Sequence, residues 1–185
     1  YPAAEAPSFA IDGDWLPANP VGSVPGDGDA ATKYLNFGRE NSGFIVTPAS
    51  GASVVRSFQI TTHNDAAGRD PSSWELWGTN DPITSADNTD GNLENWVLIE
   101  AGTIELPTDR YTPGPFVNLT GNETEYTSYK MVFPTIRDPN AANSNSMQIG
   151  EVQFFTNRVI PEPSTIALIG LGLVGVVAGR RFARR

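Results

Sequence analysis

The C-terminal twenty-five residues of this 185-residue chain combine three features that no soluble core accommodates together. A Pro-Glu-Pro triplet at 161–163 precedes an apolar segment, 165–179, and four arginines stand among the last six residues. An apolar segment that ends in arginines is typical of a membrane-associated helix whose cationic end stays in the cytoplasm. We therefore expect the residues before the triplet to lie across the membrane and to contain the folded part.

The apolar segment is short for a membrane span. Its fifteen residues form a helix of about 22 Å at about 1.5 Å per residue, whereas the hydrocarbon core of a bilayer is about 30 Å thick. Snorkelling of the arginines closes part of this gap, but four glycines lower the hydrophobicity of the segment. We therefore favour a sorting signal that is processed. A lasting C-terminal anchor is the alternative.

The residues directly before the apolar segment read Ile160-Pro-Glu-Pro-Ser164. Together with the terminal arginines, they resemble the PEP-CTERM sorting signal of Gram-negative bacteria that make exopolysaccharide. In that family, an exosortase (a membrane transpeptidase-like enzyme) reads the Pro-Glu-Pro and is thought to remove the helix and tail. The resemblance implies a processing motif at Pro161, Glu162, Pro163 and Ser164, and a membrane topology set by Arg180, Arg181, Arg184 and Arg185.

The same resemblance implies the partners and the location of the protein. We expect an exosortase-type processing enzyme and, before processing, contact with the inner membrane. The mature protein is then expected at the cell surface or in the extracellular polysaccharide matrix. Because the chain begins with Tyr1 rather than Met, we also expect a cleaved signal peptide.

Charge and cysteine content exclude several functions. Residues 1–160 contain 8 Lys and Arg against 20 Asp and Glu, a net charge of −12. So acidic a domain repels nucleic acid, and no basic patch suggests otherwise. The absence of cysteine excludes disulfides and thiolate metal sites.

The body of the chain has the composition of an all-β domain. It contains many glycines and prolines, short apolar runs and no long helical periodicity. Alternation is clear at Phe58 and Ile60, and at Tyr129, Met131 and Phe133. We predict strands at Lys33–Phe37, Gly43–Thr47, Val54–Thr62, Ser73–Thr79, Trp96–Ala101, Thr103–Leu106, Phe116–Leu119, Tyr126–Phe133 and Met147–Thr156.

These strands suit a two-sheet jelly-roll β-sandwich followed by one short C-terminal hydrophobic helix. The predicted organisation is an irregular N-terminal leader at 1–26, the sandwich at 27–156, a linker with the Pro-Glu-Pro motif at 157–164, the transmembrane helix at 165–179, and a cytoplasmic arginine-rich tail at 180–185.

Two segments of the body resemble discoidin-like, galactose-binding-like modules, which include coagulation factor 5/8 type C domains. Ser73-Trp-Glu-Leu-Trp-Gly-Thr-Asn-Asp81 resembles a characteristic strand and turn of these modules. Tyr129–Phe133 followed by Met147–Phe154 resembles their closing strands, and Asp27–Asn36 their opening, with Tyr34 where Trp is usual. The resemblance indicates the fold, but not the ligand, because such modules serve many functions.

The resemblance also implies a structural calcium ion. The family pattern places its ligands at Asp27, Thr32 and Glu151, with Asp29 supplying a carbonyl or carboxylate oxygen. Ca²⁺ takes six to eight hard oxygen ligands, which a turn rich in Asp and Gly supplies. Such an ion would join the first strand to the last. The alternative is an ordinary turn at Asp27–Asp29 and a solvated Glu151.

The sequence favours a non-catalytic protein. His63 is the only histidine, so a catalytic triad would depend on it alone, and there is no G-x-S-x-G motif. Acidic pairs such as Asp12/Asp14, Glu123/Glu125 and Asp87/Asp90 are expected by chance among so many carboxylates. A hydrolase would need two carboxylates roughly 5–10 Å apart in a deep pocket.

Two polar loops are the candidate ligand site. The first contains His63, Asn64, Asp65, Arg69 and Asp70, and the second contains Arg137 and Asn140. Side chains of these types make paired hydrogen bonds to sugar hydroxyls. The alternative is that Arg69 and Asp70 form an internal ion pair that pins the first loop.

The four tryptophans are expected to be packing residues, and Trp77 is the one whose position opposite to Trp74 and Leu76 predicts exposure. We conclude that the chain encodes an exported, non-catalytic protein that binds glycans. The alternative is a purely structural surface protein that packs against copies of itself, which an apolar sheet face or an open edge strand would favour.

Overall fold

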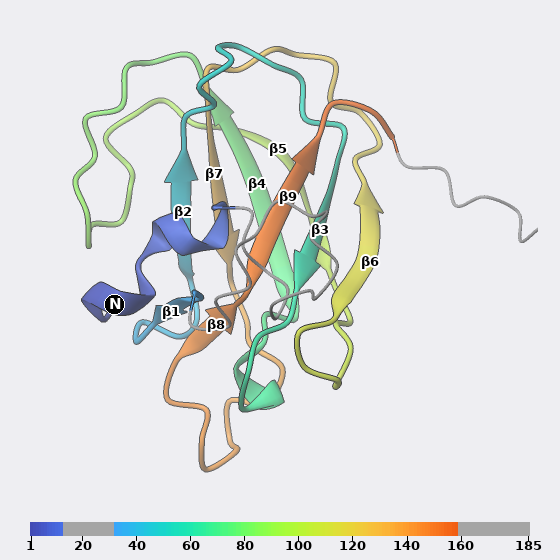
Figure 1. The fold of residues 1–185 in the computed structure, drawn as a ribbon. Coiled ribbons are helices and arrows are strands. Elements are labelled where there is room, and N and C mark those ends of the chain that lie inside the picture. Colours follow the sequence, from blue (N-terminus) through green and yellow to red (C-terminus); the bar gives the residue numbers. More distant parts are fainter. Residues whose placement is uncertain (13–31, 159–185) are drawn as a thin grey trace, which may run out of the picture.

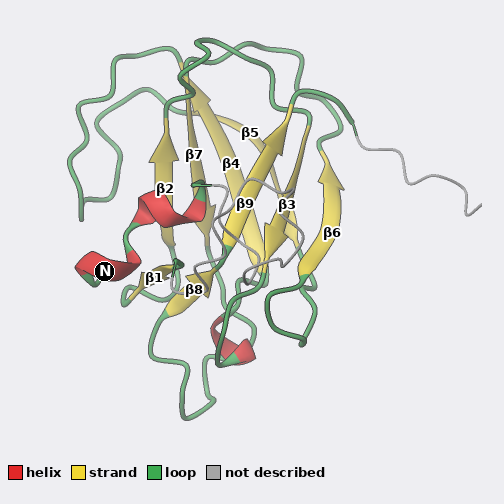
Figure 2. Ribbon diagram, viewed as in Figure 1, coloured by secondary structure: helices red, strands yellow, loops and turns green. Residues whose placement is uncertain are grey.

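The computed structural model describes residues 1–12 and 32–158, which form two antiparallel β-sheets packed face to face (Figures 1 and 2). The expectation of an all-β sandwich is therefore confirmed. The strands are β1 (Tyr34–Asn36), β2 (Ser42–Val46), β3 (Ser57–Thr61), β4 (Ser73–Thr79), β5 (Val97–Thr103), β6 (Pro113–Asn118), β7 (Ser128–Phe133), β8 (Met147–Ile149) and β9 (Glu151–Phe155). The predicted linker motif, hydrophobic helix and arginine tail lie outside the described residues, as do Asp14, Trp15, Asp27 and Asp29.

One sheet has four strands in the order β2-β7-β4-β5, and the other has three in the order β6-β3-β9. A short ladder of β1 and β8 completes the fold at one end. Figure 1 shows the three-stranded sheet in front of the four-stranded one. Within the described residues, no helix has both the length and the apolarity that crossing a membrane requires.

The core lies between the two sheets and follows the predicted alternation. Phe58 and Ile60 of β3 face Trp74 and Leu76 of β4, and all four side chains are buried. The rings of Phe58 and Trp74 meet edge to face with 4.9 Å between their centroids. Burial of side chains of this size contributes about 1.5–3 kcal/mol each to folding, so this contact between the sheets is a main source of stability.

Two predicted strand boundaries are wrong, and glycines explain both. The predicted strand Met147–Thr156 divides at Gly150, whose N–H donates to Thr61 O. A Cβ there would lie 3.0 Å from the carbonyl oxygen of Thr62. The predicted strand Trp96–Ala101 continues through Gly102, beside the ring of Trp74, and ends at Thr103 as β5, whereas residues 104–106 of the predicted strand Thr103–Leu106 form no strand.

The described part of the predicted leader contains two short 3₁₀ helices, η1 (Ala3–Glu5) and η2 (Pro7–Ala10). Helix η2 packs against β1 and β9, and Ala10 is fully buried. The start of the chain is therefore part of the folded body.

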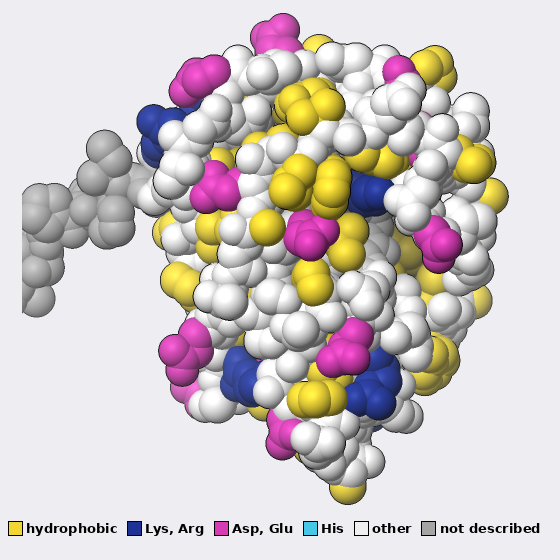
Figure 3. Space-filling model, turned by 180° about the vertical axis from the view of Figure 1, so that it is seen from behind, with side chains coloured by type: hydrophobic (Ala, Val, Ile, Leu, Met, Phe, Trp, Pro, Cys, Tyr) yellow, Lys and Arg dark blue, Asp and Glu magenta, His cyan; other side chains and the backbone are white. Residues whose placement is uncertain are grey.

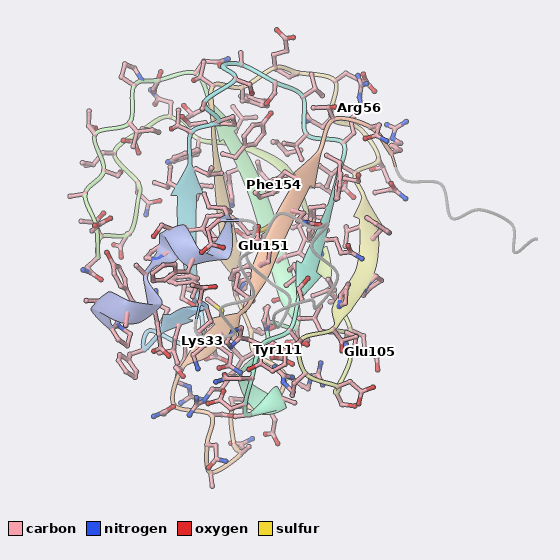
Figure 4. The ribbon with its side chains drawn as sticks, viewed as in Figure 1. Lys33, Arg56, Glu105, Tyr111, Glu151 and Phe154 are labelled. Carbon is pink, nitrogen blue, oxygen red and sulfur yellow. The ribbon has the colours of Figure 1, made fainter. Side chains whose placement is uncertain are left out.

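The loops at the two ends of the sandwich have different roles. Loops 62–72, 104–112 and 134–146 meet at one end, together with η3 (Ala67–Arg69). The described chain finishes at the other end, where Arg158 donates to the carbonyl oxygens of Leu119 and Thr120, each at 3.1 Å. Figure 4 shows Lys33 and Tyr111 at the first end and Arg56 at the second.

Candidate functional site

The two loops that sequence analysis selected as a ligand site lie against each other. Arg137 N donates to Asp70 O at 2.8 Å, and Asp138 N donates to Gly68 O at 3.1 Å. These backbone hydrogen bonds fix the position of the first loop, 62–72, beside the second loop, 134–146. We call the surface formed by these loops and loop 104–112 the distal end, since it lies opposite Arg158.

Asp70 is the centre of the distal end and is completely buried. Its carboxylate accepts two hydrogen bonds from Arg110, at 2.7 and 2.8 Å, and Arg137 lies 3.5 Å away. Burial raises the pKa of Asp70, and both arginines oppose this shift. Asp70 therefore joins three loops and is not available to a ligand.

The internal ion pair that the sequence suggested between Arg69 and Asp70 does not form. Arg69 instead lies 3.2 Å from Asp65 and donates from Nε to the carbonyl oxygen of Asn143 at 2.6 Å. The loop is pinned by ion pairs, as that alternative supposed, but with different partners.

His63 is buried beneath the surface of the distal end. Its Nδ1 donates to Asn64 Oδ1 at 3.0 Å, and its carbonyl oxygen accepts from Arg110 Nε at 2.6 Å. The ring meets that of Tyr111 edge to face at 5.0 Å. Burial lowers the pKa of His63, so the imidazole is neutral near pH 7. Its position makes it a support for Asn64 and Tyr111.

Lys33 ties the distal end to β1 and to the N-terminal helices. Its ammonium group donates to Asn64 Oδ1 at 3.0 Å and to Gln148 Oε1 at 3.4 Å, and it lies 3.2 Å from Glu5. Gln148 in turn donates to the carbonyl oxygen of Asp65 at 2.9 Å. This network fixes the orientation of Asn64 and Asp65.

The accessible groups of the distal end are therefore fewer than the sequence suggested. Asn64, Asp65 and Asn140 are exposed, while Arg69 and Tyr111 are half-buried. Within the described residues, no hydrogen bond occupies the Nδ2 of Asn64 or the hydroxyl of Tyr111. Asn64 is bonded to His63, and the ring of Tyr111 packs against the same histidine, so both groups lie close to His63.

Tyr111 has a backbone φ of 52°, which is unusual for a bulky residue. Backbone strain of this kind costs about 1–3 kcal/mol and persists only where the surrounding structure enforces it. Here Arg110, immediately before, is held by both His63 and Asp70. The strained turn is what carries the ring of Tyr111 to the surface beside His63.

Sequence analysis missed Lys33, Arg110, Tyr111 and Gln148. Lys33 and Arg110 could have been identified from the sequence, because only eight Lys and Arg stand among the first 160 residues of an acidic domain. Each of these basic side chains is therefore expected to pair with a carboxylate. No signal identified Gln148, which is fully buried.

Of the predicted calcium ligands, Thr32 and Glu151 are described. β1 and β8 pair antiparallel as far as Tyr34 opposite Ile149, and Glu151 pairs instead with Thr61 of β3. Glu151 is buried, 3% exposed, and is not the solvated residue of the alternative. A carboxylate and a hydroxyl are both hard oxygen ligands of the kind that calcium takes. No group of three or more acidic or histidine side chains that could hold a metal occurs within residues 1–12 and 32–158.

A cavity lined by described residues lacks a pair of carboxylates. A cavity of about 600 Å³ lies between the free edges of β2 and β9, lined by Val46, Tyr129 and Phe154 among others. Glu151 is the one acidic side chain among its described lining residues. Glu123, which the sequence paired with Glu125, lies at the end of the sandwich opposite the distal end, where it forms ion pairs with Arg56 and Arg158.

Trp74 and Trp77 lie on opposite faces of β4, as their strand positions predict. Trp74 is buried in the core, whereas Trp77 is half-buried on the outer face of the four-stranded sheet, as is Trp96. The ammonium group of Lys130 lies 5.5 Å from the ring centre of Trp77 and 4.9 Å from that of Trp96. Lys130 therefore fills the space between the two rings.

Comparison with known proteins identifies the C-terminal segment and the fold. Residues 159–185 match the PEP-CTERM protein-sorting motif. A search of curated proteins returns no sequence match. Among solved structures, the F5/8 type C domain of a Bacteroides fragilis protein is similar with a TM-score of 0.55 and 11% identity, covering 85% of this chain and 84% of that one.

Two carbohydrate-binding modules are also similar in fold. The family 32 module of C. perfringens NanJ, solved in complex with galactose, has a TM-score of 0.50 and 14% identity, covering 82% of this chain and 85% of that one. CBM62 of Clostridium thermocellum has a TM-score of 0.51 and 15% identity, covering 84% and 86%. At these identities the likeness establishes a shared discoidin-like fold.

Proposed function

We propose that this chain, which has a PEP-CTERM sorting motif behind a discoidin-like sandwich, is an exported, non-catalytic glycan-binding protein. The motif implies export and processing at the membrane by an exosortase. Similar folds serve as carbohydrate-binding modules in other bacteria. The observation that carries the proposal is the distal end, where the exposed Asn64 and Asp65 follow His63, against which the ring of Tyr111 packs.

The distal end has the chemistry of a sugar site. A sugar ring stacks its apolar face on an aromatic side chain, and its hydroxyls pair with amides and carboxylates. Tyr111 offers the aromatic surface, with Asn64 and Asp65 fixed nearby by His63 and Lys33. Arg69 and Asn140 complete the proposed contacts, while Asp70, Arg110 and Arg137 position the loops.

The direction of the chain suits this function. Arg158 is held at the end opposite Tyr111, and the Pro-Glu-Pro motif begins three residues later. The linker to the sorting segment therefore leaves from one end while the proposed ligand site faces the other. An anchored precursor would present the distal end away from the membrane, toward extracellular polysaccharide. We place the mature protein at the surface or in the matrix of a Gram-negative bacterium.

A structural calcium ion is part of the proposal. Thr32 and Glu151 would bind it, with Asp27 and Asp29 supplying further oxygen ligands. The ion would link the chain before β1 to the start of β9. It would stabilise the fold and take no part in catalysis.

The test is glycan binding by the full-length protein in detergent. On a panel of bacterial and plant polysaccharides, we expect wild type to retain at least one glycan. Tyr111→Ala should weaken that binding at least tenfold, because an aromatic side chain at the centre of a binding site contributes about 2 kcal/mol or more and tenfold corresponds to about 1.4 kcal/mol. Phe116→Ala, which removes an exposed aromatic side chain of β6 outside the distal end, serves as the matched control and should bind like wild type. Equal binding by both variants would place the site elsewhere.

A further inference from the structure

The two sheets leave four strand edges, and β5 is the least protected of them. A free edge presents unpaired N–H and C=O groups, which natural proteins protect with prolines, lysines or covering segments. β6 contains Pro113 and Pro115, and β9 packs against η2. β5 reads Val97-Leu-Ile-Glu-Ala-Gly-Thr103 and has no proline or basic residue.

The outer edge of β5 is open. The strand pairs only with β4, and within the described residues it makes no further backbone hydrogen bond on its other side. Its one charged residue, Glu100, does not guard this edge. The carboxylate accepts from the N–H and hydroxyl of Thr120, at 2.7 and 3.0 Å, and is therefore held toward the facing sheet.

Apolar side chains concentrate beside this edge. Five large hydrophobic side chains are exposed in the described residues, and three of them fall within six positions: Leu93 (73%), Val97 (53%) and Leu98 (47%). Val97 points to the opposite face of the strand from Leu98, so we call Leu93 and Leu98 the β5 surface. Leu98 lies opposite Trp77 on the outer face of the sheet. Figure 3, seen from behind, shows hydrophobic side chains gathered on this side of the molecule among scattered acidic ones.

The loop that carries Leu93 is held firmly in place. The neighbouring Glu94 accepts hydrogen bonds from the hydroxyl of Ser85 at 2.7 Å and from the N–H groups of Thr84 and Ser85 at 2.6 and 2.8 Å, and these bonds lower its pKa to about 2. Lys130 of β7 donates to Gly91 O at 3.1 Å. The exposure of Leu93 is thus a fixed feature of the fold, and its apolar surface is preorganised for contact.

We propose that β5 pairs antiparallel with β5 of a second copy of this chain, across a two-fold axis. Only another strand satisfies the row of unpaired backbone groups, and the two-fold axis sets the β5 surface of one copy against the same surface of the other. A pairing centred on Leu98 avoids setting the two Glu100 carboxylates opposite each other, which would be repulsive.

A second copy is the partner that the charges and the sorting motif favour. The domain has a net charge of −12 over residues 1–160, but the β5 surface itself is uncharged. Two acidic molecules therefore meet where their repulsion is weakest. A shared sorting signal also delivers many copies to the same place, which raises their local concentration.

The absence of cysteine allows a direct test by cross-linking the full-length chain. Facing strands place equivalent Cα atoms about 4.5–5.5 Å apart, within the range that a disulfide bridges. In detergent under mild oxidation, Leu98→Cys should form a disulfide-linked dimer at least tenfold faster than Phe37→Cys, an equally exposed control far from β5. A mixture of Val97→Cys and Ile99→Cys chains, whose positions face each other in this register, serves as the second test if Leu98→Cys fails to fold.

Two outcomes would overturn the proposal. One is equal cross-linking of Leu98→Cys and Phe37→Cys in detergent, and the other is no dimer from any of the β5 variants.

Discussion

Arg110 donates two hydrogen bonds to the fully buried carboxylate of Asp70, which lies 40 positions earlier in the sequence. The same arginine donates to the carbonyl oxygen of His63 and directly precedes Tyr111. This one ion pair thus links the loop that supports Asn64 to the loop that carries the aromatic ring. The proposed sugar site depends on its integrity.

Removing the carboxylate should therefore destabilise the domain strongly. Asp70→Ala leaves Arg110 and Arg137 without their buried partner, and breaking a buried pair in this way costs about 3–5 kcal/mol. The free energy of unfolding in urea, followed by tryptophan fluorescence, measures the loss. Asp65→Ala, which removes an exposed carboxylate from Arg69, is the control and should cost about 1 kcal/mol or less. Equal losses from the two variants would contradict this account.

Stability should fall in mild acid because of His63. Burial lowers the pKa of His63 in the folded state below its ordinary 6.5, so the unfolded chain binds this proton first as the pH falls. The contribution of the neutral imidazole is present above pH 6.5 and is lost as the pH falls through the folded-state pKa. Urea midpoints between pH 7.5 and 5 report this slope, and His63→Gln should flatten it. An unchanged slope in the variant would assign it to other groups.

Calcium should stabilise the folded domain if the proposed ion is bound. At a free concentration one hundred times the dissociation constant, a ligand specific for the folded state contributes about 2.7 kcal/mol. Chelation should therefore lower the melting temperature by about 5–10 °C for a domain of this size. Glu151→Gln should abolish the response to added calcium. A melting temperature that chelator leaves unchanged would argue against the ion.

Lys130 should hold the loop that bears Leu93. Its ammonium group lies between Trp77 and Trp96 and donates to Gly91 O, so Lys130→Met loses both interactions. We expect a loss of about 1–2 kcal/mol and a change in tryptophan emission. Denaturant titration with fluorescence detection measures both together. A variant with wild-type stability and emission would show that the cation contributes nothing here.

The sequence predicted the sheets well because strand patterning is local. Phe58 and Ile60 alternate with polar neighbours, and the same period marks Tyr129, Met131 and Phe133. Strand ends were less predictable. Gly102 looks like a break in the sequence, but in the structure it makes room for Trp74.

The distal end was predicted only in outline. Loops 62–72 and 134–146 have a visible excess of polar residues, and they do lie together. Which of their side chains face solvent depends on partners far away in the sequence, such as Lys33 for Asn64 and Arg110 for Asp70. No local pattern specifies such pairs, so the predicted ligand set mixed supporting residues with accessible ones.

The account of sorting requires that the sandwich leaves the cell and loses its tail. The most direct test is the intact mass of the protein recovered from cells of its native host. We expect a mature chain that ends near Pro161–Ser164, without the apolar segment and arginines or with a conjugate in their place. A chain that ends at Arg185 and stays in the membrane fraction would contradict this, and the protein would then be an anchored surface module.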